Sequence, residues 1–90
     1  NTAWNGVLVA LDLYMQKRGI TKKGRKKVED YQDLIAKENR KLLKVFHSAY
    51  NYLHLLMGYD GDLNIKTAKT GLELAEEIIQ WVEKRLQHKS

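Results

Sequence analysis

Hydrophobic residues crowd the first segment of the chain. Ten of the thirteen residues from Ala3 to Met15 are apolar, and only Asn5, Gly6 and Asp12 interrupt the run. A helix of that composition is apolar on nearly every side, and such a helix normally lies inside a bundle. We therefore expect a helix over residues 2–18 that needs cover on several sides. A helix before residue 1, missing here, or a second copy of the chain would supply that cover.

Three further segments have the apolar spacing of helices, at about residues 27–37, 39–57 and 64–86. Their predicted buried stripes are Val28, Tyr31, Leu34 and Ile35 in the first; Leu42, Leu43, Val45, Phe46, Ala49, Tyr50, Leu53, Leu56 and Met57 in the second; and Ile65, Ala68, Leu72, Ala75, Ile78, Ile79, Val82 and Leu86 in the third. We expect Thr2 and Asn64 to be N-caps and Gly19 to end the first helix. No segment alternates with period two. The pattern predicts an all-α fold: one domain over residues 1–90, an up-and-down bundle of three long helices and a short one.

Composition removes several classes of protein. The 90 residues contain no cysteine, which excludes disulfide frameworks and thiolate metal sites and fits a reducing cytoplasm. No apolar stretch reaches the roughly 18 residues that cross a bilayer. We expect a cytoplasmic protein with no cofactor, no membrane partner and no identifiable small-molecule ligand.

The net charge of +5 is concentrated in one place. Residues 17–27 contain seven bases and no acid, whereas the other seventy-nine residues contain nine bases and eleven acids. The candidate nucleic-acid contacts are the basic residues of the loop, Lys22, Lys23, Arg25, Lys26 and Lys27. Clustered lysine and arginine bind phosphates without regard to sequence, but no aromatic residue is interleaved to stack on bases. A solvated loop explains the same residues.

The predicted helix at residues 39–57 has a polar face. Arg40, Lys44, His47, Asn51 and His54 fall within roughly 40° of one line on a helix of 3.6 residues per turn. An arginine and imidazoles on one face could act as acid and base on a phosphodiester. The line lies opposite the apolar stripe, however, so a solvated outer face is the favoured interpretation.

No metal site is predicted. His47 and His54 are two turns apart, too far for the i, i+4 pairing of metal-binding helices. The turn at residues 60–64 matches the first ligand positions of a calcium loop, but Ile65 replaces the required glycine and Gly71 the required glutamate.

Several segments together resemble a known family. They are Ala-Trp-Asn-Gly-Val-Leu-Val-Ala-Leu at residues 3–11, Val-Glu-Asp-Tyr at 28–31, Phe-His-Ser-Ala-Tyr at 46–50, Leu-His-Leu with Gly-Tyr-Asp-Gly at 53–61, and Ile-Gln-Trp-Val-Glu-Lys at 79–84. The chain resembles a family of small bacterial proteins with a domain of unknown function, whose helical arrangement is similar to the HEPN superfamily. The resemblance implies a further helix before residue 1 and dimerisation. Some HEPN proteins are ribonucleases with an Arg-x(4–6)-His motif, which Arg40 and His47 fit at its longest spacing. Those enzymes usually have Asn, Asp or His after the arginine, where this chain has Lys41.

The sequence thus favours a HEPN-like helical bundle that acts as a non-catalytic protein-interaction module and forms a homodimer. The alternative is an RNA-binding protein or metal-independent ribonuclease. In that alternative Arg40 steadies phosphate charge, His47 acts as acid or base, and the basic loop holds the RNA backbone.

Overall fold

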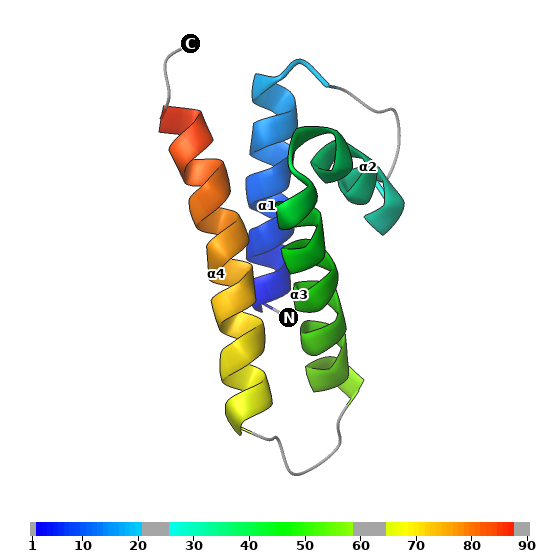
Figure 1. Ribbon diagram of the computed structural model, residues 1–90, viewed down its shortest axis with the longest axis vertical. Helices are drawn as coiled ribbons and strands as arrows, with labels where there is room; N and C mark the ends of the chain where they lie inside the picture. The colour runs from blue at the N-terminus through cyan, green and yellow to red at the C-terminus, as the bar shows by residue number, and fades with distance from the viewer. Residues whose placement is uncertain (1, 21–25, 59–64, 88–90) are drawn as a thin grey trace.

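The computed structural model describes residues 2–20, 26–58 and 65–87, and within them all side chains except those of 54–58 and 65. Four helices, and no strand, make up these described ranges: α1 (Thr2–Lys17), α2 (Val28–Glu38), α3 (Arg40–Gly58) and α4 (Ile65–Gln87). The helix α3 runs antiparallel to α1 and α4, and the short α2 lies beside the upper half of α3 (Figure 1). The predicted all-α bundle of three long helices and one short helix is confirmed.

The core follows the predicted stripes. Leu42, Phe46, Ala49 and Leu53 are all buried, as their spacing of three and four residues along α3 requires. Aromatic rings tie the other long helices to this line. The ring of Trp4 lies 5.3 Å from that of Phe46, and the ring of Tyr14 lies 5.2 Å from that of Trp81. Contacts between aromatic rings therefore fix α1 against both α3 and α4.

The end of α1 forms as predicted. Gly19 has a φ of +72°, and its N–H donates to the carbonyl of Gln16 at 3.1 Å. The N–H of Ile20 donates to the carbonyl of Met15 at 2.9 Å. This pair of bonds is the Schellman motif, which glycine favours because it lacks a Cβ. At the other end the prediction was wrong, because Thr2 is already helical and is not the N-cap. The predicted cap Asn64 lies outside the described residues.

Polar side chains bond to the backbone at three further helix ends, the starts of α2 and α3 and the end of α4. The Lys27 N–H donates to Asp30 Oδ2 at 2.6 Å before α2, and the Leu42 N–H donates to Asn39 Oδ1 at 3.1 Å before α3. At the end of α4, Lys17 Nζ donates to the carbonyl of Arg85 at 2.8 Å. A cation at this position also interacts favourably with the negative end of the helix dipole. Lys17 therefore joins the last turns of α1 and α4.

One predicted core residue is exposed. Leu72 is 54 % exposed, whereas the sequence pattern places it in the buried stripe of α4. It lies two turns before Ile79, on the same side of α4, and Ile79 Cδ1 is 3.5 Å from where a Cβ on Gly6 would stand. Two turns are about 10.5 Å, but α1 begins at Thr2, only about 6 Å before Gly6. The described part of α4 therefore extends past Thr2, the first described residue of α1, and no described residue of α1 lies level with Leu72.

Candidate functional site

The polar face of α3 points outward. Arg40, Lys44, His47 and Asn51 are exposed, as expected of the side opposite the core; the side chain of His54 lies outside the described set. Arg40 and His47 are seven residues apart, which is about 10.5 Å along the helix axis. His47 Nδ1 lies 3.4 Å from Gln32 Nε2 of α2, a long contact between two exposed side chains. Within one chain, therefore, the arginine and the imidazole do not converge on one point.

Two residues of the predicted basic loop contribute to the fold. Lys26 Nζ lies 3.1 Å from Asp12 Oδ1, and the backbone of Lys27 forms the cap of α2. The Tyr31 hydroxyl donates to the same Asp12 oxygen at 3.0 Å. Burial, aided by this hydrogen bond and by the charge of Asp12, raises the pKa of Tyr31 to about 12. Asp12 thus ties the start of α2 to α1.

The remaining loop residues, Lys22, Lys23 and Arg25, lie outside the described residues, so the predicted nucleic-acid contact there stays a prediction. The turn at residues 60–64, whose first positions match a calcium loop, also lies outside them. Among the described residues, no group of three or more His, Cys, Asp or Glu side chains is placed to hold a metal ion.

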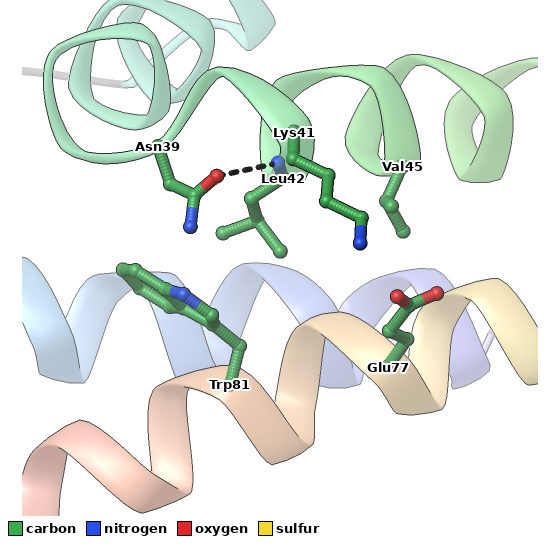
Figure 2. Close-up of a pocket in the computed structure, with 6 residues that line it drawn as sticks. All are labelled: Asn39, Lys41, Leu42, Val45, Glu77 and Trp81. Carbon is green, nitrogen blue, oxygen red and sulfur yellow. Dashed lines mark hydrogen bonds between the residues drawn. The ribbon is translucent and has the colours of Figure 1, made fainter.

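A shallow pocket of about 150 Å³ lies between the start of α3 and the middle of α4 (Figure 2). Its lining consists of Asn39, Lys41, Leu42, Val45, Glu77 and Trp81. Lys41 and Glu77 extend into it from opposite helices, so a cation and an anion face one another there. The Trp81 Nε1 is buried and has no hydrogen-bond partner among the described atoms. Because the two charges offset one another, the pocket presents no surplus charge to select a ligand.

The outer face of α1 is unusual for the surface of a bundle. Opposite the core it presents Thr2, Asn5, Val9, Leu13 and Gln16, here called the α1 stripe, and all five side chains are exposed. Val9 is 58 % exposed and Leu13 is 49 % exposed. None of the five is charged, although charged residues usually occupy the outward face of a helix. An uncharged face with exposed apolar residues at its centre is typical of a protein–protein contact.

The two charged residues of α1 are both engaged elsewhere. Asp12 contacts Lys26 and Tyr31, and Lys17 binds the carbonyls at the end of α4. Ile20, three residues after the end of α1, is 39 % exposed. Sequence reasoning indicated that α1 needs cover but did not single out Val9 and Leu13. The only signal for them was the length of the apolar run itself.

Comparison with known families places the chain. The model of a family described as a domain of unknown function, DUF5618, matches residues 1–84. The chain belongs to the DUF5618 family. No curated protein and no solved structure matches this DUF5618 domain at a significant level. The predicted membership of an unknown-function family is confirmed, while the likeness to the HEPN superfamily stays a prediction.

In this DUF5618 domain, no described helix is both long and apolar enough to cross a bilayer. The exposed apolar residues of the α1 stripe, Val9 and Leu13, are flanked by the uncharged polar residues Asn5 and Gln16, so they form a short, narrow strip. A strip of this kind suits contact with another protein surface. Of the three surfaces described above, the α1 stripe is the strongest candidate site.

Proposed function

We propose that this DUF5618 domain is a non-catalytic protein-interaction module that forms a homodimer through the α1 stripe. The observation that carries the proposal is the exposure of Val9 and Leu13 at the centre of a face with no charged residue. Each exposed apolar Å² that becomes buried contributes about 25 cal/mol. A second copy offers the same uncharged face, so pairing buries apolar surface without desolvating an ion.

Charge supports the choice of this face for self-association. The chain has a net charge of +5, and two copies repel each other wherever their basic surfaces meet. The exposed side of α3 has Arg40, Lys41 and Lys44, which oppose close approach of a second α3. The α1 stripe has none of these charges. Two copies therefore meet there with less repulsion than through α3.

Analytical ultracentrifugation of Leu13→Lys tests the proposal. A lysine at the centre of the stripe places two ammonium groups in the contact, so we expect the dissociation constant of the dimer to rise at least tenfold. The matched control is Ala36→Lys, which adds the same charge at an exposed position on α2. Circular dichroism shows whether each variant stays folded. A wild-type protein that remains monomeric at millimolar concentration, or a Leu13→Lys dimer as tight as the wild type, would contradict the proposal.

One observation favours RNA binding as a second candidate. The first five residues of α3 include Arg40, Lys41 and Lys44, and the whole of α3 contains no acidic residue. Cations near a helix N-terminus are disfavoured by the helix dipole, each by about 0.3–1 kcal/mol. A bound phosphate chain would offset that cost. In this second candidate, with the HEPN-like arrangement that the sequence suggests, Arg40 and His47 are the residues to test for cleavage.

A further inference from the structure

We infer that two copies of the domain pair antiparallel, α1 against α1, about a two-fold axis at the level of Leu11. The inference rests on the proposed function and adds the geometry of the contact. The occupant of the α1 stripe is thus a second copy in one defined orientation. The order of residues in the stripe and the charge at the end of α1 support this arrangement, and the length of the stripe limits the strength of the contact.

The order of residues in the α1 stripe reads nearly the same in both directions. Along the helix it runs Asn5, Val9, Leu13 and Gln16: an amide, two apolar residues and another amide. When a second helix is turned about an axis at the level of Leu11, Val9 lies opposite Leu13 of the second copy. Asn5 then lies opposite Gln16 of the second copy. Side-chain amides both donate and accept hydrogen bonds, so the two ends of the contact can be satisfied while the centre is apolar.

Charge selects the antiparallel orientation over the parallel one. The basic residues Lys17 and Arg18 stand at the end of α1, and both are exposed. Arg18 is paired with Glu38 at 3.2 Å, whereas Lys17 Nζ donates to the backbone carbonyl of Arg85 at 2.8 Å. A parallel pair brings the two Lys17–Arg18 ends together and aligns the helix dipoles, both of which are unfavourable. In the antiparallel pair the two Lys17 residues are about 18 Å apart along the axis. That distance exceeds the screening length of about 8 Å in physiological salt.

The length of the stripe limits the strength of the contact. From Thr2 to Gln16 the helix rises about 21 Å. One helix face of that length buries less than the roughly 1,600 Å² of a standard stable interface. We therefore expect a weak, reversible dimer with a dissociation constant in the micromolar range or above. Measurements need protein concentrations of that order.

Disulfide trapping tests the orientation. Because the chain contains no cysteine, only the introduced thiols can form disulfides. Asn5→Cys and Gln16→Cys variants are oxidised separately and as a mixture, and products are separated on non-reducing gels and identified by mass. A disulfide requires Cα atoms within about 7 Å, so only residues that face each other react well. We expect the mixed disulfide to form at least tenfold faster than either self-disulfide. The background control is Gln16→Cys mixed with Gln80→Cys, an exposed position on α4.

Each outcome separates the orientation from the proposed function. Self-disulfides that form as fast as the mixed one indicate parallel pairing and overturn the inference. If no disulfide exceeds the control although the wild type sediments as a dimer that Leu13→Lys disrupts, the antiparallel register is wrong but the interface stands. If Leu13→Lys leaves the dimer intact, or the wild type is monomeric, the proposed function fails and the inference fails with it.

Discussion

Glycine-to-alanine substitutions at Gly6 in α1 and Gly71 in α4 are expected to change the free energy of unfolding in opposite directions. In a helix, alanine is more favourable than glycine by roughly 0.5–1 kcal/mol. A Cβ on Gly6 would lie 3.5 Å from Ile79 Cδ1, an ordinary van der Waals distance. We therefore expect Gly6→Ala to raise the free energy of unfolding by about 0.5–1 kcal/mol.

A Cβ on Gly71 has no comparable room. It would lie 3.0 Å from Leu53 Cδ2 and 3.4 Å from the Cβ of Tyr52. Leu53 is fully buried, so it has little space into which to move. Overpacking of a core typically costs about 1–3 kcal/mol, which exceeds the gain in helix propensity. We expect Gly71→Ala to lower the free energy of unfolding by about 1 kcal/mol.

Urea denaturation followed by the fluorescence of the two tryptophans measures both changes. A change of 1 kcal/mol shifts the melting temperature of a domain of this size by roughly 4–8 °C, which calorimetry resolves. The control is a double-mutant cycle with Leu53→Ala. In that shortened background the clash is absent, so Gly71→Ala should become stabilising. If Gly71→Ala stabilises the unaltered chain as much as Gly6→Ala does, the close approach of α3 and α4 at this point is wrong.

Two further predictions concern the pH dependence of stability and the RNA candidate. Burial, then the hydrogen bond and charge of Asp12, raise the pKa of Tyr31 from 10.0 to about 12, so this residue stabilises the fold fully below pH 10 and its contribution is lost as pH rises to 12. Urea titrations at pH 9 and 11 should show a smaller loss for Tyr31→Phe than for the wild type; an equal loss would refute the assignment. For the RNA candidate, we expect labelled RNA to bind the wild type more tightly than Arg40→Ala, with Lys84→Ala as the control on α4. Equal inactivity of the wild type, Arg40→Ala and His47→Ala toward RNA would reject cleavage under those conditions.

Local sequence patterns predict much of the helical structure. The spacing of Leu42, Phe46 and Leu53 predicts the buried side of α3, and all three are buried. Gly19 marks the end of α1, where its positive φ is observed. These features depend on residues within a turn or two of one another. Propensity and periodicity operate at that range, so the sequence alone suffices for them.

The candidate site required the tertiary structure. Within the apolar run of α1, no local pattern distinguishes the buried Leu11 from the exposed Val9 and Leu13. The distinction depends on which side of α1 meets α3 and α4, and those helices are far away in the sequence. Leu72 shows the same limit, because its exposure depends on which residues of distant helices lie level with it. The sequence determined that α1 needs cover; the packing of distant helices decided which of its residues are left to provide a contact.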